Sequence, residues 1–469
     1  MCEMSSREKS VPPPPVADWS LGRKVFARFL SGVAGLLLKG VFRSVDIVGR
    51  LPAESGPTLV VANHFWGFFD PILIYYLLGG RVYFLAKSGL FKTKPAELFL
   101  RGLGALPVYR TGEGRPEDNF ATFDACYEAL AAGRTIALFP EGTTADQSKL
   151  LPVKTGAARI ALGARGRQVT GLRIVPVGLT YDDQWKVRGR VVVEIGPAID
   201  IDAEVLAYRI EGGATTETDR EAVGKLTAVI EQRLRRVVPG YESGQQALAL
   251  GLAAEIALRR PDRPRRPIAL QQREVLARRL ATGSQRDLEE LLAAVGDYRR
   301  SLDLLGLEDQ QVFQYPTWRL ARRLALTVLG AGLLLPAAVA GLLLNAPPLL
   351  ALLATERIKV ELYLRSIIRP LLVLFAFPLT WAVWVALTPP DAPVWVPVVV
   401  FVGCPLLGVV ALFVFGRVEV LWRRWEGWAK LLTAESLRSR LLTRRDRVVA
   451  AVLIIQPEAP FVTDEDVGA

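Results

Sequence analysis

The sequence predicts an α/β domain with a mostly buried mixed sheet flanked by helices, followed by a helical region and C-terminal transmembrane helices. Between residues 45 and 200, short apolar runs alternate with helical patterns, which is typical of a sheet covered by helices. Long uncharged runs lie near the C-terminus, between residues 324 and 416. With 469 residues, the chain is long enough for about three structural units.

The composition favours a protein held at an anionic membrane surface. Hydrophobic residues make up 51% of the chain, and 58 Lys and Arg against 47 Asp and Glu give a net charge of +11. Soluble enzymes rarely combine these two properties. The cysteines, Cys2, Cys126 and Cys404, have neither metal-ligand spacing nor the pattern of a disulfide framework. Because His64 is the only histidine, metal sites built on imidazole are excluded, and we expect no metal.

The N-terminal residues are expected to lie outside the folded domain or at its membrane face. Residues 1–20 contain the run Pro12 to Pro15 and predict a disordered leader. Residues 21–44 combine basic side chains with an apolar run that is too short to cross roughly 30 Å of hydrocarbon, and no cleavage site follows it. We expect an interfacial helix there; a helix buried on the core is the alternative.

Residues 45–240 are expected to form the catalytic domain. The strands are expected at residues 46–48, 58–62, 82–86, 106–109, 135–139, 173–179 and 191–195, and helices around 116–132 and 154–165. In domains of this kind, functional residues usually lie in the loops that follow the strands. We therefore expect the functional residues of this domain in its loops.

The loop after the strand at 58–62 contains His64 and Asp70, a histidine followed by a carboxylate. A carboxylate that fixes the tautomer of an imidazole is typical of general-base sites. On an unbroken helix, six positions would place the two side chains about 120° apart, so they would not meet. Gly67 between them can supply the bend that brings them together. The neighbouring aromatic residues suit a fatty-acyl substrate; a purely structural histidine is the alternative.

Three further segments follow other strands. They are Gly104-Ala105-Leu106-Pro107-Val108-Tyr109-Arg110, Phe139-Pro140-Glu141-Gly142-Thr143-Thr144 and Val175-Pro176-Val177-Gly178. Together with the His64 loop, and in this order, they resemble the four motif blocks of the glycerolipid acyltransferase superfamily, which includes acylglycerol-phosphate and glycerol-3-phosphate acyltransferases. The resemblance covers roughly residues 55–200. Lys154-Thr155-Gly156 and Ile195-Gly196-Pro197 add to it.

The resemblance implies a glycerolipid acyltransferase-like fold and specific roles for site residues. His64 is expected to be the general base that takes the proton from an acceptor hydroxyl, and Asp70 to orient it. Arg110 is expected to bind the acceptor phosphate through its planar guanidinium. The other expected substrate-binding residues are Glu141, Gly142, Thr143 and Lys154, with Glu141 receiving a glycerol hydroxyl or holding Arg110.

The chain departs from the superfamily pattern at two positions. Five residues separate His64 from Asp70, where four are commonest, and Thr144 stands where an arginine often follows Glu-Gly-Thr. Phosphate binding is therefore expected to rest on Arg110 and Lys154; an acceptor that differs from the usual one is the alternative. These departures bear on the identity of the substrate more than on the type of reaction.

Residues 241–316 are expected to form a helical region. Residues 225–313, with Tyr241-Glu242-Ser243 and the segment 304–312, resemble the region that follows the catalytic domain in dual glycerol-3-phosphate/dihydroxyacetone-phosphate acyltransferases. Those proteins also carry C-terminal membrane segments. This likeness is closest to that branch of the superfamily and favours glycerol-3-phosphate as the acceptor.

Residues 317–416 are expected to hold the membrane segments. Residues 370–390 and 392–416 are each long enough for a full crossing and predict a hairpin. Basic residues flank the pair and the loop between them has none, so the positive-inside rule places both ends in the cytosol. Asn345-Ala346-Pro347-Pro348 interrupts the run 324–355, which is expected to be re-entrant or spanning.

The last part of the chain is basic and then acidic. Residues 417–455 are expected to form a basic amphipathic helix, because Trp422, Trp425 and Trp428 recur at helical spacing among many Arg and Lys. A helix packed on the protein itself is the alternative. Residues 456–469 are expected to be a disordered tail.

These observations predict an integral membrane O-acyltransferase of phospholipid biosynthesis, with its catalytic domain on the cytoplasmic face. Its expected co-substrate is acyl-CoA or acyl carrier protein, with no other cofactor, and its expected acceptor is glycerol-3-phosphate. Lysophosphatidate or another lysophospholipid is the alternative acceptor. A non-catalytic lipid-binding membrane protein is the alternative outside this class. Nucleic acid is not expected as a partner, because the basic residues flank membrane segments. The oligomeric state and chain-length preference are left open.

Overall fold

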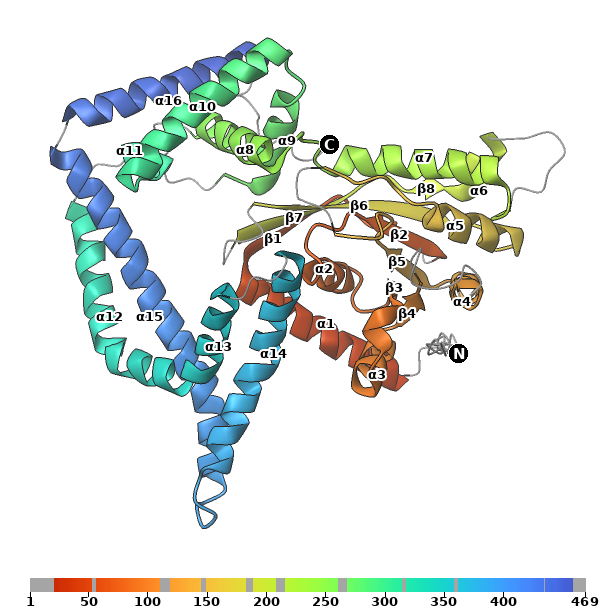
Figure 1. The fold of residues 1–469 in the computed structure, drawn as a ribbon, viewed down its shortest axis with the longest axis horizontal. Helices are drawn as coiled ribbons and strands as arrows, with labels where there is room; N and C mark the ends of the chain where they lie inside the picture. Colours follow the sequence, from red (N-terminus) through yellow and green to blue (C-terminus); the bar gives the residue numbers. More distant parts are fainter. Residues whose placement is uncertain are drawn as a thin grey trace, which may run out of the picture. The chain divides into compact units, whose positions relative to one another are not determined.

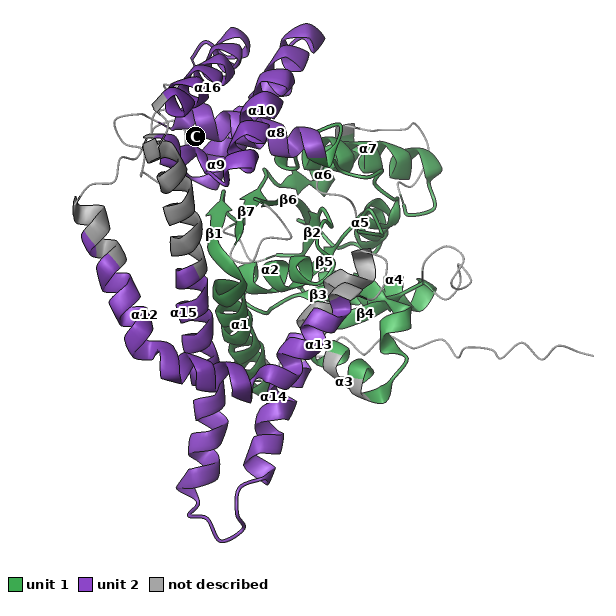
Figure 2. Cartoon of the chain, turned by 60° about the vertical axis from the view of Figure 1, so that its left-hand side comes forward, with its two compact units in different colours: residues 1–244 green, residues 245–469 purple. Residues whose placement is uncertain are grey.

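The computed structural model describes residues 21–52, 56–109, 119–144, 149–182, 189–207, 216–259, 268–313, 318–357, 362–433 and 435–458. The chain divides into two compact units, residues 1–244 and 245–469, which are coloured separately in Figure 2. The expected leader, residues 1–20, and residues 459–469 of the expected tail lie outside the described residues.

The first unit is built on an eight-stranded mixed sheet (Figure 1). The strands are β1 (Phe42–Val48), β2 (Thr58–Ala62), β3 (Tyr83–Lys87), β4 (Ala105–Val108), β5 (Thr135–Leu138), β6 (Arg173–Tyr181), β7 (Gly189–Ile195) and β8 (Ile199–Asp200). Their order is β1-β7-β6-β2-β5-β3-β4, and β8 pairs with β6. Strands β7 and β8 run antiparallel to β6, and the other pairs are parallel. The predicted α/β fold with a mixed sheet is therefore confirmed.

The central strands are buried because helices cover both faces of the sheet. Leu59, Val60 and Val61 of β2 are fully buried, and eight of the nine residues of β6 are buried. Continuous apolar runs of this kind are what a strand covered on both faces requires. Helices α5 and α7 lie on one side of the sheet, and α1 and α2 lie on the other (Figure 1). The strand ends, rather than the strand faces, are thus the accessible parts of this sheet.

The helices of the first unit include several that the sequence patterns did not predict. They are α1 (Leu21–Val41), α2 (Phe69–Leu77), the short 3-10 helix η1 (Ser88–Phe91), α3 (Lys94–Gly102), α4 (Phe120–Ala131), α5 (Gly156–Gly166), α6 (Ile201–Ala207) and α7 (Arg220–Val237). The helices expected around 116–132 and 154–165 correspond to α4 and α5. Helix α2 was missed because most of it, from Ile72 onward, reads as a short apolar run, which does not distinguish a short helix from a strand.

The expected interfacial helix at 21–44 is three residues too long. Helix α1 ends at Val41, and Phe42 begins β1, which was expected to begin at residue 46. One side of α1 packs on the core through Ala27 and Leu38, while Phe29 and Leu36 on another side are 65% and 74% exposed. The helix therefore combines a face buried on the domain with an exposed apolar face.

Five helices form the polar part of the second unit. They are α8 (Gly244–Leu258), α9 (Leu270–Leu280), α10 (Gln285–Leu305), α11 (Asp309–Phe313) and α16 (Glu435–Ile455). The buried carboxylate of Asp309 contacts Nε of Arg259 and Nε of Arg445, both at 3.0 Å, and accepts a 2.8 Å hydrogen bond from Tyr298. This buried cluster joins α16, near the end of the chain, to α8, α10 and α11.

Four apolar helices complete the second unit. They are α12 (Trp318–Leu344), α13 (Ala346–Arg357), α14 (Leu362–Ala386) and α15 (Trp395–Thr433). Among the described residues, Ala325–Leu344 and Trp395–Val418 are long and apolar enough to cross a membrane. The described apolar part of α14, Phe375–Ala386, is shorter than the crossing expected at 370–390.

The basic amphipathic helix expected at 417–455 falls on two described helices. Its first part continues α15 up to Thr433, and α16 begins at Glu435, with residue 434 outside the described residues. The side chains of Trp422, Trp425 and Trp428 lie outside the described residues. The apolar run of α15 passes into its basic part without a helix-breaking residue, and for that reason the two segments form one helix.

Candidate active site

The candidate site lies where neighbouring parallel strands end. Strand β2 pairs in parallel with β5 on one side and β6 on the other, so their carboxyl ends meet at the same edge of the sheet. His64 follows β2, Glu141 follows β5, and Tyr181 is the last residue of β6. Three residues from three separate parts of the sequence are brought together in this way.

The side chain of Asn63 fixes the start of the loop between β2 and α2, because it hydrogen-bonds to the backbone of β6. The Asn63 amide donates to the carbonyl of Leu179 at 3.0 Å and accepts from the N–H of Leu179 at 2.7 Å. The side chain is fully buried. These two bonds hold the next residue, His64, beside the end of β6.

His64 and Asp70 meet, as the sequence analysis expected for a bent loop. The distance between His64 Nδ1 and Asp70 Oδ2 is 2.8 Å. Residues 63–68 form the turn that contains Gly67, and Asp70 lies in the first turn of α2. Asp70 Oδ2 accepts from the N–H of Trp66 at 2.7 Å, and the N–H of Asp70 donates to the Trp66 carbonyl at 3.1 Å. The loop is therefore closed on the same carboxylate that orients the histidine.

Asp70 is fully buried and receives a third hydrogen bond from Tyr181. The Tyr181 hydroxyl donates to Oδ1, opposite the oxygen that faces His64. Burial, together with the nearby Asp70 charge, raises the pKa of Tyr181 well above its ordinary value, so its hydroxyl stays protonated. Both oxygens of Asp70 therefore accept hydrogen bonds at the first turn of α2.

The ring of His64 is oriented with one nitrogen toward Asp70. Because Asp70 is surrounded by donors, it acts as the acceptor, and His64 Nδ1 carries the hydrogen. The ring stacks on Phe139 at a centroid distance of 4.2 Å, and the side chain is 15% exposed. Among the described residues, Nε2 has no hydrogen-bond partner. That nitrogen therefore offers its lone pair to a group that enters from outside.

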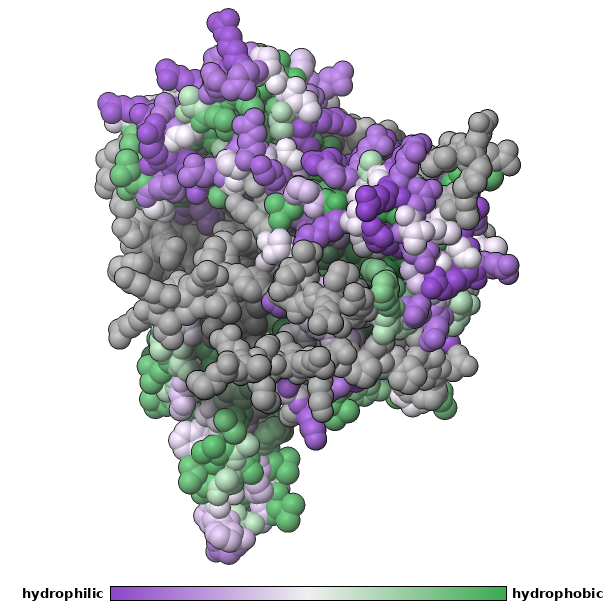
Figure 3. Space-filling view, turned by 45° about the vertical axis from the view of Figure 1, so that its right-hand side comes forward, coloured by the Kyte–Doolittle hydropathy of each residue, from purple (hydrophilic) through white to green (hydrophobic). Residues whose placement is uncertain are grey.

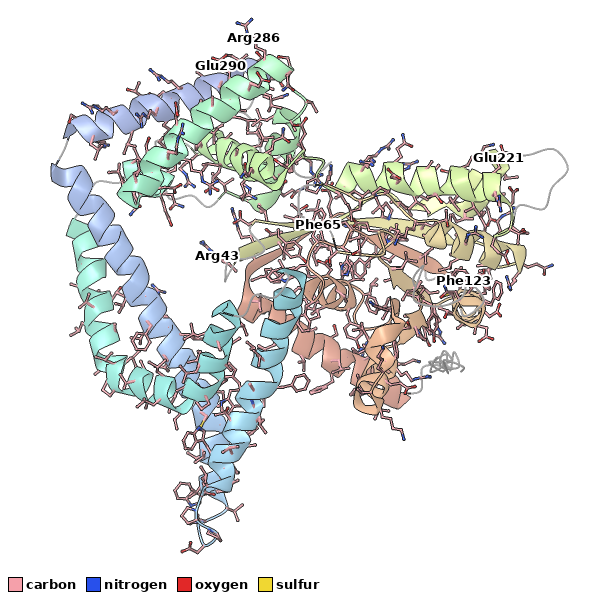
Figure 4. The ribbon with its side chains drawn as sticks, in the orientation of Figure 1. Arg43, Phe65, Phe123, Glu221, Arg286 and Glu290 are labelled. Atoms are coloured by element: carbon pink, nitrogen blue, oxygen red, sulfur yellow. The ribbon has the colours of Figure 1, made fainter. Side chains whose placement is uncertain are left out.

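Aromatic side chains pack behind the His64–Asp70 pair. Trp66 contacts Phe42, Phe69 and Tyr181 at ring centroid distances of 5.8, 4.6 and 5.5 Å. Phe65, next to His64, is buried and is labelled in Figure 4 within the α/β unit. These rings support the loop from the protein side, so only part of the expected apolar surface remains available to a substrate.

Glu141 supports the loop rather than facing the opening. Its Oε1 accepts from the N–H of His64 at 2.7 Å, and its Oε2 accepts from the N–H of Leu151 at 3.0 Å. Burial raises the pKa of the Glu141 carboxyl, although both of these backbone donors favour its charged form. The carboxylate therefore holds the His64 loop and the loop after β5 together, a position that the sequence alone did not indicate.

Gly142 and Lys154 lie side by side next to Glu141. Gly142 has a φ of +70°, and a Cβ atom at this position would approach Lys154 Nζ to 2.6 Å. The N–H of Lys154 donates to the Pro140 carbonyl at 2.9 Å, and its side chain and that of Thr143 are exposed. The structure thus brings the Lys154 ammonium to the same loop as Glu141.

Arg110, the expected phosphate-binding residue, lies outside the described residues. The residues on either side of the segment 110–118 are joined to each other. The N–H of Tyr109 donates to Asn119 Oδ1, and Asn119 Nδ2 donates to the Tyr109 carbonyl, both at 2.9 Å. Tyr109 follows β4, so the segment containing Arg110 begins and ends at one point of the sheet edge.

The sequence analysis missed Tyr181 and Asn63. Tyr181 lies just beyond the Val175-Pro176-Val177-Gly178 block. Its position, as a polar aromatic residue at the end of a buried strand, could have indicated a site residue. Asn63 precedes His64 directly, and a buried amide after a strand is the kind of residue that continues a hydrogen-bond ladder. Neither residue could be assigned a partner from spacing, because each partner lies more than 100 residues away.

A charged carboxylate that orients a histidine at the strand ends defines an α/β domain with a general-base site. Residues 44–180 match the family described as Acyltransferase. A 1-acyl-sn-glycerol-3-phosphate acyltransferase of Bacillus subtilis is 31% identical over 188 residues, which cover 39% of this chain and 87% of that protein. The chain therefore belongs to the acyltransferase family.

Other similar proteins match a smaller share of their own length or at lower identity. Glycerol-3-phosphate O-acyltransferase 2 of Saccharomyces cerevisiae is 33% identical over 213 residues, which cover 43% of this chain and 27% of the yeast protein. The chain thus spans well under half of that relative. The crystal structure of the 1-acyl-sn-glycerophosphate acyltransferase from Thermotoga maritima aligns over 46% of this chain and 83% of that chain, with a TM-score of 0.32 and 22% identity.

Proposed function

We propose that the protein is a membrane-bound glycerolipid O-acyltransferase. It transfers a fatty acyl group from acyl-CoA or acyl carrier protein to a glycerol phosphate acceptor in phospholipid biosynthesis. The observation that carries the proposal is the 2.8 Å contact between His64 Nδ1 and Asp70 Oδ2, while Nε2 has no hydrogen-bond partner within the described part of the chain. Membership of the acyltransferase family supports the type of reaction.

In the proposed reaction, His64 Nε2 takes the proton from the acceptor hydroxyl while the oxygen attacks the carbonyl carbon of the thioester. Asp70 stabilises the imidazolium that forms. As the tetrahedral intermediate collapses, the C–S bond breaks, and the imidazolium returns the proton to the leaving thiolate. The products are an ester and a free thiol, and no covalent acyl-enzyme forms. A positioned base contributes about 10²- to 10⁴-fold to such a rate.

The acceptor is proposed to be glycerol-3-phosphate. The Lys154 ammonium is exposed next to the loop that Glu141 holds, where it can pair with a phosphate. Arg110 is proposed to contribute a second cation from the end of β4. Relatives from Saccharomyces cerevisiae that are named for glycerol-3-phosphate support this acceptor, and relatives named for 1-acyl-sn-glycerol-3-phosphate support lysophosphatidate as the second candidate.

We further propose that the chain is an integral membrane protein with its catalytic domain on the cytoplasmic face. The two helical segments that are long and apolar enough to cross a membrane support membrane residence. The basic residues that flank the α14–α15 hairpin support the orientation.

The test is turnover by the purified full-length protein in detergent or vesicles. Radiolabelled glycerol-3-phosphate and lysophosphatidate are each supplied with acyl-CoA and with acyl carrier protein as donor. We expect the wild type to acylate glycerol-3-phosphate faster, and His64→Ala to lower the rate by about 10²- to 10⁴-fold. Equal rates for wild type and His64→Ala would remove His64 from the reaction. Faster turnover of lysophosphatidate would change the acceptor but not the mechanism.

A further inference from the structure

We infer that α12 and α13 form a re-entrant hairpin that enters the bilayer and returns to the same face, whereas the α14–α15 hairpin passes through to the opposite face. The inference rests on the membrane residence proposed above and concerns only how the helices lie in the bilayer. The occupant that we assign to their exposed apolar faces is the hydrocarbon interior of a phospholipid bilayer.

The first observation is a helix break at which polar groups find partners inside the protein. Helix α12 ends at Leu344 and α13 begins at Ala346. The Asn345 amide donates to the carbonyls of Gly341 and Cys404 at 2.8 and 3.1 Å, and the Trp384 indole donates to the carbonyl of Leu344 at 2.9 Å. Inside hydrocarbon, a break is tolerated only when the freed carbonyls find partners in the protein.

The second observation is that the break is fastened to both helices of the neighbouring hairpin. Asn345 is 2% exposed, and its Oδ1 accepts from the Trp381 indole of α14 at 2.8 Å. Its amide also reaches α15 through the carbonyl of Cys404. The side chain of Asn345 thus uses its acceptor and its donor within the helix group, which suits a polar group without access to water.

The third observation is the depth of the break along α15. Cys404, which contacts Asn345, lies about 14 Å from Trp395 and about 20 Å from Arg417 at a rise of 1.5 Å per residue. The hydrocarbon layer is about 30 Å thick. If the uncharged part of α15 crosses this layer, the break lies near its middle rather than at either surface.

The direction of α13 follows from the position of α14. Trp381 contacts Asn345, and Leu362 lies about 28 Å from Trp381 along the helix, on the side away from the loop 387–394. Helix α13 ends at Arg357, shortly before Leu362 in the sequence, so it must lead back toward the end of α15 at which Arg417 lies. Its 12 residues span about 18 Å, enough to return from mid-depth to that face. Figure 1 shows α13 beside α14, above the projecting α14–α15 loop.

Close backbone contact holds α12 against α15. A Cβ atom on Gly341 would overlap the backbone carbonyl of Leu407, and one on Gly408 would approach the Asn345 amide to 3.0 Å. Small residues at helix crossings are typical of membrane helix pairs. Away from this seam, apolar side chains are exposed, for example Leu333 at 82%, Leu350 at 64% and Leu412 at 72%. Figure 3 shows apolar residues on the projecting lower part of the molecule, with more polar residues at its tip.

The test is the labelling of single cysteines in sealed vesicles with a membrane-impermeant maleimide, starting from a variant with Cys2, Cys126 and Cys404 replaced by alanine. Cysteines replace Arg322, Arg357 and Asp391 in turn. We expect Arg322→Cys and Arg357→Cys to react from the same face, and Asp391→Cys to react from the opposite face. Labelling of the first two from opposite faces would overturn the re-entrant hairpin. Labelling of all three from one face would overturn the crossing by α14 and α15.

A second measurement locates the bend. A nitroxide attached at Leu343→Cys, whose side chain is 66% exposed, is expected to collide with dissolved oxygen in preference to a water-soluble nickel complex. The control, Val394→Cys, is 84% exposed beside the outer loop and is expected to show the reverse. Nickel preference at both positions would overturn the mid-depth bend. Release of the protein from membranes by alkaline carbonate would instead overturn membrane residence. If the released protein still transfers acyl groups, the proposed reaction stands although the membrane inference fails.

Discussion

At the scale of single residues, the candidate site depends on how one carboxylate is held. Asp70 is fully buried, and its three donors are the N–H of Trp66, the ring of His64 and the hydroxyl of Tyr181. Each donor comes from a different direction, so the carboxylate cannot rotate without losing a hydrogen bond. The His64 ring is therefore oriented before any substrate enters, which is the arrangement that makes proton transfer efficient.

We predict that Tyr181→Phe lowers kcat by about tenfold and leaves both KM values unchanged. Tyr181 contacts Asp70 and positions it, and a hydrogen bond to a charged group is worth about 1.5–3 kcal/mol, where 1.4 kcal/mol corresponds to a factor of ten. Steady-state kinetics with the preferred acceptor measure the change. Tyr127→Phe, a matched control in α4 of the same unit, is expected to keep wild-type kinetics. An unchanged kcat for Tyr181→Phe would remove Tyr181 from the positioning of Asp70.

We predict that Glu141 makes stability depend on pH. Burial raises the pKa of its carboxyl above the ordinary 4.5, so the folded protein keeps the proton at a pH where the unfolded chain loses it. The contribution to stability is fully present below about pH 4.5 and is lost as the pH rises through the raised pKa. Thermal unfolding of the full chain should show the Tm of the wild type falling relative to that of Glu141→Gln between pH 4.5 and neutral pH. A Tm difference that is independent of pH would contradict this.

At the scale of elements, the site depends on how α7 closes over β6. A Cβ atom on Gly178 would overlap the backbone carbonyl of Val237, where α7 ends. Strand β6 carries both Tyr181 and the backbone that holds Asn63. The glycine in the Val175-Pro176-Val177-Gly178 block therefore permits the close contact between α7 and β6.

We predict that Gly178→Ala destabilises the protein by about 1–3 kcal/mol, because an added methyl group in a tight contact forces backbone shifts. The measurement is the apparent Tm of the full chain in detergent. Gly224→Ala is the matched control, because Gly224 lies in the second turn of α7 and a Cβ atom there would meet no atom within 4 Å. The control is expected to keep or slightly raise the Tm. A wild-type Tm for Gly178→Ala would show that the contact can relax without cost.

The elements also show which parts of the fold the sequence could predict. The apolar strand runs predicted the sheet, because a buried parallel strand excludes polar residues along its whole length. The interruption at Asn345-Ala346-Pro347-Pro348 predicted a break, which the structure places at Asn345. The end of α1 at Val41 was missed because apolar residues continue from the helix into β1.

At the scale of the whole molecule, the candidate site is assembled from contacts between distant parts of the sequence. The His64–Asp70 pair was predictable, because a single loop contains both residues. The bonds from Tyr181 to Asp70 and from His64 to Glu141 join residues that are 111 and 77 positions apart, which no local pattern specifies. Only the sheet order β6-β2-β5 brings them together. The sequence of one loop was therefore enough to predict the His64–Asp70 pair. The contacts that Tyr181 and Glu141 make with this pair follow only from the fold.

The most direct test of the account uses the fact that His64 is the only histidine in the chain. The nitrogen-15 spectrum of protein labelled at histidine then reports one imidazole ring. At a pH where the ring is neutral, we predict that the hydrogen lies on Nδ1 and that Nε2 is bare, and that Asp70→Asn weakens this preference. A ring with its hydrogen on Nε2, or an identical spectrum in wild type and Asp70→Asn, would contradict the claim that Asp70 prepares His64 to act as the base.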